Sequence, residues 1–311
     1  MRVTFLGSGT FAIPCFEALL EAGHEVVALV CQPDRESGRG RALAPPPTKT
    51  VAERHGVPVL QFHKVREAEA QDALRQLRPE LQVVVAFGQI LPRPVIDTAP
   101  LGTLNVHASL LPRYRGAAPI QWAIACGEIE TGVTTMLIDE GLDTGPTLLA
   151  RPTPIGPGET AAELEPRLAR LGAELLLETV RGLAAGTLVP HPQDHARATL
   201  ARILEKEDGR IDWNRPAREI ACRARGFTPW PGAFTWYDGR ILKAVRVLPL
   251  TEPGDAVEPG TVLAAGRDGV DVACGGGTRL RLVEVQPESR RAMPSAAWAA
   301  GARLRPGLRL G

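Results

Sequence analysis

Two polar side chains with catalytic chemistry stand two residues apart in the segment Asn105-Val106-His107. The run TLNVHA at 103–108 is typical of a strand, and strand alternation places Asn105 and His107 on one face. Ligands in open α/β sheets bind at the carboxyl ends of strands. An amide can stabilise a developing oxyanion and an imidazole can move a proton, so the pair suits acyl transfer. A satisfied polar pair at a strand end is the alternative interpretation.

A carboxylate that could join this pair follows in the loop DEGLDTG at 139–145. Its two glycines allow the chain to fold back tightly after the strand expected at 132–139. An acid delivered there would stand beside His107 and favour the protonated imidazole. The alternative is an ordinary turn rich in Asp and Gly.

A glycine motif, GSGTFA at 7–12, follows the first expected strand and opens a helix. It matches the pattern GxGxxG/A of dinucleotide-binding proteins, in which a helix N-terminus offers free N–H groups to an anion. Asp34 lies near the end of the second strand, but beyond Gln32-Pro33 and inside an irregular loop. An NAD(P) oxidoreductase therefore remains an alternative from these residues.

The front of the chain alternates strand and helix patterns. Strands are expected at 2–6, 24–31, 81–87, 103–108 and 132–139, and helices at 11–23, 66–77 and 161–186. This alternation predicts an α/β domain with a doubly wound parallel, Rossmann-like sheet over residues 1–189. The segment 32–50 interrupts the alternation, with three consecutive prolines and no apolar face.

The rear of the chain has a different pattern. Residues 190–207 are mostly polar and are expected to form a linker. After a helix at 215–226, five short runs with strand alternation follow, separated by turn signals such as DG and GGG. Residues 208–311 are therefore expected to form a small β-barrel of the OB type, with an SH3-like barrel or a sandwich as alternatives.

The net charge of +1 conceals two halves of opposite sign. Residues 1–189 hold 17 Lys and Arg against 21 Asp and Glu, whereas residues 190–311 hold 19 against 14. A basic rear part indicates a polyanionic partner such as nucleic acid, with chance scatter of charge as the alternative.

The cysteines and apolar runs indicate the compartment. The five cysteines form neither a CxxC pair nor a Cys/His cluster, so we expect no disulfide framework and no metal site. No run of eighteen apolar residues occurs, and the first residues resemble a strand rather than a signal peptide. We therefore expect a cytoplasmic protein that does not bind a membrane.

Several motifs together resemble one family. The run NVHASLLPRYRGAAPIQWA at 105–123, followed by GLDTG, is similar to the signature of the 10-formyltetrahydrofolate-dependent formyltransferases. Further similar runs stand in the same order along nearly the whole chain: FLGSGTFAIP, QPDRESGRGRALAPPPTK, VVVAFGQILP, EKEDGRIDW and GFTPWPGAF. The match is strongest to the members of that family that act on methionyl initiator tRNA.

The resemblance implies roles for the site residues. Asn105 and protonated His107 would stabilise an oxyanion formed from the formyl group of 10-formyltetrahydrofolate, and Asp143 would orient His107. The folate would be held by two segments, namely Phe87, Gly88 and Ile90 of the first and Ser109, Leu110, Leu111 and Pro112 of the second. Ala108 stands where the family usually has Gly, and Phe87 stands where Tyr is frequent.

The resemblance also implies the acceptor. The loop Gly38-Arg39-Gly40-Arg41 resembles the family's tRNA-acceptor loop, with Arg39 at the position of its key arginine. We expect a monomer whose basic rear domain binds tRNA phosphates. A formyltransferase for a sugar nucleotide or another small amine, and a non-catalytic RNA-binding protein, are the alternatives.

Overall fold

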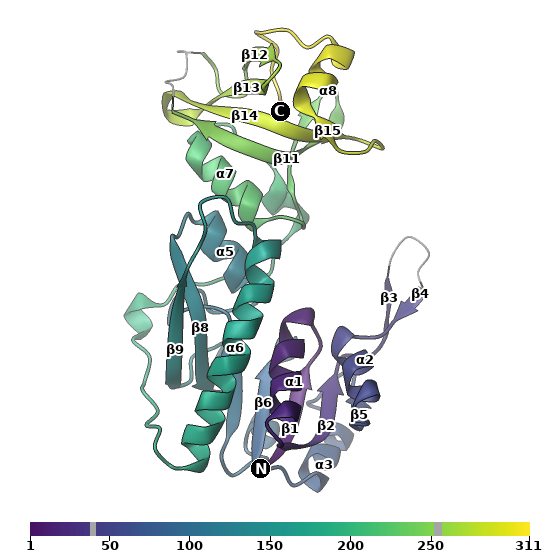
Figure 1. The fold of residues 1–311 in the computed structure, drawn as a ribbon, viewed down its shortest axis with the longest axis vertical. Helices are drawn as coiled ribbons and strands as arrows, with labels where there is room; N and C mark the ends of the chain where they lie inside the picture. The colour runs from purple at the N-terminus through teal and green to yellow at the C-terminus, as the bar shows by residue number, and fades with distance from the viewer. Residues whose placement is uncertain (38–41, 252–256) are drawn as a thin grey trace. The chain divides into compact units, whose positions relative to one another are not determined.

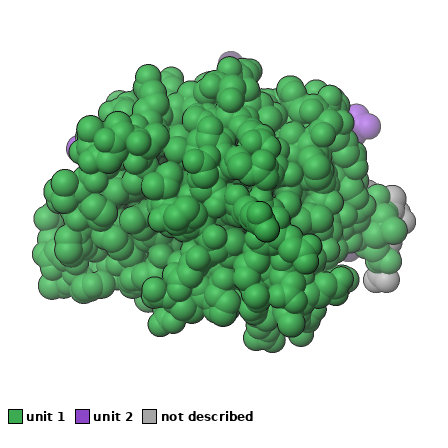
Figure 2. All heavy atoms as spheres, turned by 90° about the horizontal axis from the view of Figure 1, so that it is seen from below, with its two compact units in different colours: residues 1–119, 130–154, 165–202 green, residues 120–129, 155–164, 203–311 purple. Residues whose placement is uncertain are grey.

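The computed structural model describes residues 1–37, 42–251 and 257–311. The chain forms two compact units, which are coloured separately in Figure 2. Unit 1 comprises residues 1–119, 130–154 and 165–202, and unit 2 comprises residues 120–129, 155–164 and 203–311. Residues 190–202 of the expected linker thus belong to unit 1, and unit 2 includes two segments from the front of the chain.

Unit 1 contains a seven-stranded sheet in the order β5-β2-β1-β6-β7-β8-β9 (Figure 1). The first five strands are parallel, β8 is antiparallel to β7, and β9 is antiparallel to β8. The α/β prediction is confirmed, and the sheet is mixed, with two antiparallel strands at one edge. The strands are β1 (Arg2–Gly7), β2 (Glu25–Cys31), β5 (Val59–Gln61), β6 (Leu81–Val85), β7 (Thr103–His107), β8 (Glu130–Leu137) and β9 (Thr147–Pro154).

Helices cover both faces of this sheet because successive side chains of a strand point to opposite faces. Phe5 of β1 makes an edge contact with Phe16 of α1 (Ile13–Glu21), at 5.2 Å between ring centroids. The next residue, Leu6, shares a buried cluster with Leu74 of α3 (Ala68–Gln76) and Val95 of α4 (Arg93–Ile96). Figure 1 shows α1 in front of the sheet beside the long helix α6 (Ala161–Ala184).

The irregular segment after β2 is partly ordered into short elements. Strands β3 (Arg35–Ser37) and β4 (Ala42–Ala44) pair antiparallel, and α2 (Pro47–Arg54) follows. Proline suits the first turn of a helix, because the N–H that it lacks has no helical partner there. The short η1 (Thr10–Ala12) and η2 (His195–Arg197) are the 3-10 helices of unit 1 within the described residues.

Unit 2 contains a six-stranded antiparallel sheet in the order β10-β11-β14-β13-β12, with β15 paired to β14. Ile220 of α7 (Ala217–Gly226) and Trp298 of α8 (Ser295–Ala302) pack with Leu280 and Leu282 in its core. A small β domain after the α/β domain is therefore confirmed. The strands are β10 (Ala233–Tyr237), β11 (Arg240–Leu250), β12 (Val262–Gly266), β13 (Gly269–Cys274), β14 (Thr278–Pro287) and β15 (Met293–Pro294).

The remaining elements of unit 2 are short. Helix α5 (Pro119–Ala125) lies there except for its first residue, and η3 (Lys206–Gly209) and η4 (Gly275–Gly277) are single 3-10 turns. None of the helices in the described part of the chain has the length and apolar character needed to span a bilayer.

Candidate active site

Asn105 and His107 lie at the carboxyl end of β7, as the strand pattern predicted. β7 pairs with parallel β6 on one side and antiparallel β8 on the other, which fixes both side chains in register. His107 is only 6% exposed, and Asn105 is partly buried. The side chains of Asn105 and His107 therefore project from a strand that is paired on both sides.

The loop between β8 and β9 folds back on itself. The Asp139 carboxylate accepts hydrogen bonds from the Gly141 N–H at 3.0 Å and from the Thr144 hydroxyl at 2.6 Å. Gly145 lies so close to the Leu137 carbonyl oxygen that any Cβ at this position would collide with it. Both Gly141 and Gly145 are required because a Cβ at either position would collide with its neighbours. The tight turn that they allow returns Asp143 towards β7.

Asp143 lies among the polar groups at the end of β7. Its Oδ2 is 3.6 Å from His107 Nδ1 and accepts a hydrogen bond from the Gly116 N–H at 2.8 Å. Its Oδ1 accepts a longer bond from Asn105 Nδ2 at 3.4 Å. The structure thus brings the three predicted catalytic side chains together.

The second ring nitrogen of His107 has a fixed partner. Nε2 lies 2.9 Å from the Tyr114 carbonyl oxygen, which can only accept, so Nε2 carries a hydrogen. Nδ1 then faces the Asp143 carboxylate. At 3.6 Å the two groups form an ion pair when the ring is protonated.

The arrangement has the components needed for acyl transfer. Asn105 Nδ2 is held only weakly by Asp143, so the amide has donor capacity for a carbonyl oxygen. His107, when protonated, carries positive charge beside that amide, and Asp143 supplies the negative charge that balances it. An amide donor and an ionisable imidazole can stabilise an oxyanion and relay a proton.

The expected folate segments both border this centre within unit 1. Ser109 is fully buried, and its hydroxyl donates to the Arg113 carbonyl at 2.6 Å. Thr134 of β8 accepts from the Leu111 N–H at 3.1 Å, which fixes the segment Ser109–Pro112 against the strand. Leu110, Leu111 and Pro112 are each partly buried.

The other expected folate segment follows β6. Phe87 is buried in a core cluster, Gly88 has φ of 78°, and Ile90 is 85% exposed. Ile90 is therefore the apolar side chain of this segment that is accessible to a ligand. The Phe87 carbonyl accepts a hydrogen bond from Gln32 Nε2 at 3.2 Å.

The expected tRNA loop, Gly38, Arg39, Gly40 and Arg41, lies outside the described residues. Its base is described and polar. Lys49 Nζ binds the Asp34 carboxylate at 2.9 Å, and Gln61 Nε2 donates to Asp34 at 2.7 Å. These two hydrogen bonds lower the pKa of Asp34, and the bond from Gln61 has the larger effect.

The same contacts bear on the dinucleotide alternative. The Asp34 carboxylate is engaged by Lys49 and Gln61. A Cβ at Gly7 would lie 2.7 Å from the Val85 carbonyl oxygen of β6, so strand packing alone requires this glycine. The packing of the sheet therefore accounts for the first glycine of the GSGTFA motif without a bound dinucleotide.

Two further residues reach the site without having been predicted. Gln193 binds the carbonyl oxygens of Asp143 and Gly145, and Arg115 binds Gln193. Arg115 stands inside the quoted run PRYRGAAP, but its spacing gave no role for its side chain. Gln193 lies in the expected linker, where no local pattern marks it.

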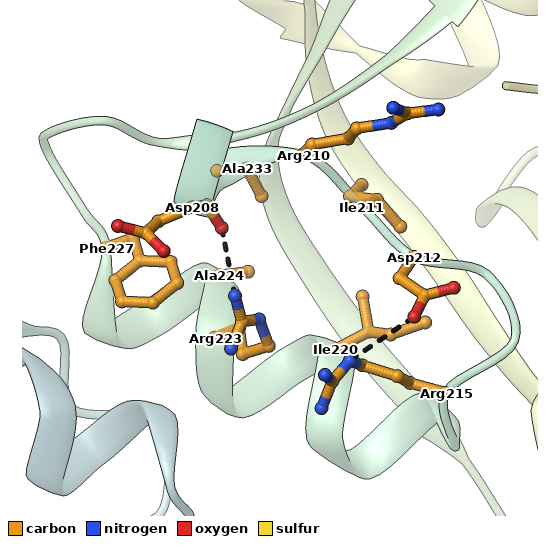
Figure 3. A pocket seen from close by; sticks show the side chains of 11 residues that line it. Asp208, Arg210, Ile211, Asp212, Arg215, Ile220, Arg223, Ala224, Phe227 and Ala233 are labelled. Carbon is orange, nitrogen blue, oxygen red and sulfur yellow. Dashed lines mark hydrogen bonds and ion pairs between the residues drawn. The ribbon is translucent and has the colours of Figure 1, made fainter. Parts of the chain in front are cut away.

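A separate small pocket lies in unit 2 between α7, β10 and the segment 208–215 (Figure 3). The Arg223 guanidinium donates to the Asp208 carbonyl at 3.2 Å and lies over the Phe227 ring, 4.9 Å from its centroid. None of the residues that line it was a predicted site residue. The bond from Arg223 to Asp208 holds the run EKEDGRIDW against α7.

Comparison with known proteins identifies both parts of the chain. Residues 1–180 match the formyl transferase family, and residues 203–303 match the formyl transferase C-terminal domain. The methionyl-tRNA formyltransferase of Citrifermentans bemidjiense is 52% identical over 311 residues, which is 100% of this chain and 96% of that protein. The enzyme of the same name from Anaeromyxobacter dehalogenans (strain 2CP-1) is 55% identical over 304 residues, 97% of each.

Solved structures of lower identity share the fold. WlaRD, a sugar 3N-formyl transferase, is 15% identical with a TM-score of 0.68, over 94% of this chain and 99% of that one. HypX from Aquifex aeolicus, solved with tetrahydrofolic acid, is 20% identical with a TM-score of 0.63, over 96% of this chain and 47% of that one. With family matches to both parts and full-length relatives above 50% identity, this chain belongs to the formyl transferase family.

Proposed function

We propose that this chain transfers the formyl group of 10-formyltetrahydrofolate to the α-amine of methionyl initiator tRNA. The observation that carries the proposal is 52% identity to a methionyl-tRNA formyltransferase across the whole of this chain. The product would be N-formylmethionyl-tRNA, the substrate of translation initiation.

The polar centre of unit 1 supports this chemistry. As the amine nitrogen forms its bond to the formyl carbon, the carbonyl oxygen becomes an oxyanion. Asn105 Nδ2 would donate to it, and the positive charge of protonated His107 would stabilise it. The bond from the formyl carbon to the folate nitrogen then breaks. Protonated His107 would pass a proton through water to that nitrogen and would regain one from the amine. Asp143 would stabilise the charged form of His107 with which this relay starts and ends.

The donor site would lie between the two segments that border this centre. Exposed Ile90 and partly buried Leu110 and Leu111 are the apolar contacts that suit a pterin ring. Backbone groups of Phe87–Ile90 and Ser109–Pro112 would supply the polar anchors. A solved structural neighbour, HypX, binds tetrahydrofolic acid, which agrees with a folate as donor.

The acceptor would be bound by the loop at 38–41 and by the rear domain. We propose that residues 1–189 hold the catalytic domain and residues 208–311 the tRNA-binding domain, joined by residues 190–207. Unit 2 exposes many basic side chains, which suit phosphate contacts: Arg240, Lys243, Arg246, Arg267, Arg290, Arg291, Arg303 and Arg305.

Incubation with 10-formyltetrahydrofolate and charged initiator tRNA tests the proposal, with formylmethionine released from the tRNA as the readout. A nucleotide-linked amino sugar serves as the competing acceptor, because sugar formyltransferases share the fold. Formylation of the tRNA alone is the expected result. Formylation of the sugar alone would overturn it.

A further inference from the structure

The segment 191–201, most of which lacks helix and strand structure, runs along the active-site side of unit 1. His191 and Thr147 exchange backbone hydrogen bonds of 2.9 and 2.8 Å beside the loop of Asp143. Arg115 donates from its N–H to the Thr199 carbonyl at 2.9 Å and accepts from the Ala201 N–H at 2.7 Å. The segment is therefore attached both to the Asp143 loop and to the connection that follows His107.

Gln193 is the side chain of this segment that reaches the Asp143 loop. It is 7% exposed, and its Nε2 donates to the carbonyl oxygens of Asp143 at 2.9 Å and Gly145 at 2.7 Å. Its Oε1 accepts from Arg115 Nε at 3.1 Å and from the second guanidinium nitrogen Nη2 at 2.7 Å. Both amide hydrogens and the amide oxygen are thus used, so the orientation of the amide is determined.

Arg115 completes a closed set of contacts around Asp143. Its guanidinium, buried at 5% exposure, holds Gln193, and Gln193 holds the Asp143 backbone. The residue after it, Gly116, donates its N–H to the Asp143 carboxylate. Asp143 is therefore fixed at its backbone and at its side chain by two branches that meet at Arg115.

This double attachment matches a conformational need. Asp143 has φ of 50°, in the left-handed region that a residue with a Cβ rarely adopts. Such a conformation persists when surrounding contacts determine it. Without the bond from Gln193, the loop could relax and move the carboxylate away from His107 Nδ1.

We propose that Gln193, oriented by Arg115, is a positioning residue for formyl transfer. It holds the Asp143 backbone so that the carboxylate stays beside His107. The inference rests on the proposed function, in which Asp143 stabilises positive charge on His107.

The variant Gln193→Glu tests this role. A glutamate keeps an oxygen for Arg115 but places an oxygen, not N–H groups, against the carbonyls of Asp143 and Gly145. We expect kcat for methionyl-tRNA to fall about 10- to 100-fold while KM for tRNA and folate changes less than about twofold, since remote misplacement of a catalytic group acts on the chemical step. The pH profile of kcat should also shift, because His107 and Asp143 no longer act at a fixed distance.

The matched control is Gln71→Glu. Gln71 also donates from Nε2 to a backbone carbonyl, that of Arg66, at 2.8 Å, but in α3 and away from the loop. Its kcat and pH profile should match those of the wild type. If Gln193→Glu fails to fold, Gln193→Met, which removes the hydrogen bonds at similar size, takes its place.

Amide hydrogen exchange gives a readout that does not need activity. Amide hydrogens in peptides covering 139–146 should exchange faster in the Gln193 variant than in the wild type. In the Gln71 control their exchange rate should equal that of the wild type. Unchanged exchange there, or unchanged kcat, would overturn the positioning role. A wild type that does not formylate methionyl-tRNA would overturn the proposed function instead, while the exchange result would still decide whether Gln193 holds the loop.

Discussion

The charge of Asp143 gives the sharpest test of the site. Asp143→Asn keeps the shape of the side chain and an oxygen that can accept from the Gly116 N–H, now 2.8 Å from the carboxylate. It removes the negative charge that lies 3.6 Å from His107 Nδ1. The variant therefore separates electrostatic stabilisation of His107 from packing of the loop.

The size of the effect follows from the distance. Two unit charges 3.6 Å apart interact by about 1.2 kcal/mol at the dielectric constant of water and by about 4.6 kcal/mol at an effective value of ~20. The side chains are 6% and 17% exposed, so the site lies between these limits. At 1.36 kcal/mol for each factor of ten, the limits correspond to losses of roughly 7-fold and 2,500-fold. We expect kcat to fall about 100-fold.

Single-turnover formylation of methionyl-tRNA, with saturating folate donor, measures this loss directly. Glu140→Gln is the control, because it removes one negative charge from an exposed position in the same loop. Its rate should stay within about twofold of the wild type, in keeping with the small effects of exposed charges. An Asp143→Asn rate within threefold of the wild type, or an equal loss in Glu140→Gln, would refute the electrostatic argument.

The remaining predictions concern the donors, the RNA loop, the thiols and the core. Asn105→Ala and His107→Ala should each lower the transfer rate at least ~100-fold with an unchanged melting temperature, and steady-state kinetics with calorimetry checks both. Arg39→Ala should weaken use of tRNA while folate affinity measured without RNA stays constant, and Arg39→Lys should restore only part of the loss, because a lysine cannot form the planar fork. Burial raises the pKa of Cys15 and Cys274 to about 12 and that of Cys31 to about 11, so these thiols stay protonated at neutral pH. Mass spectrometry after iodoacetamide should therefore find the first adduct on exposed Cys126, and early labelling of the other three would contradict this. Leu282→Ala, at a fully buried position of unit 2, should destabilise that unit by about 2–5 kcal/mol, whereas Val245→Ala, 42% exposed, should not lower the melting temperature measurably.

Local patterns were sufficient to place the pair on β7. Asn105 and His107 share a face because strand side chains alternate, and this requires only the sequence around them. The loop of Asp143 was predicted as a tight turn from its glycines, and the structure gives Gly141 and Gly145 steric reasons. The roles of the three side chains in formyl transfer stay predictions that the variants above test.

Contacts between distant segments could not be predicted in the same way. Gln193 and Asp143 are 50 residues apart, and no local pattern in a polar segment shows which loop its amide will contact. Strand direction is also not encoded in the alternation of one strand, so the antiparallel pairing of β8 and β9 became evident only in the sheet. Helix α2 was missed because its prolines resembled a loop, although a proline is compatible with a helix start.

The discontinuous composition of unit 2 has a consequence for the synthesis of the chain. Helix α5 packs closely on α7: Trp122 meets Phe227 at 5.4 Å between ring centroids, and a Cβ at Gly226 would lie 2.6 Å from the Gln121 carbonyl oxygen. A ribosome adding ~5–20 residues per second needs roughly 5–20 s to reach α7 after α5 has been made. During that time Trp122 of α5 lacks its partner Phe227. A nascent chain that pauses within this interval thus exposes the apolar surface of α5 to chaperones and to neighbouring nascent chains.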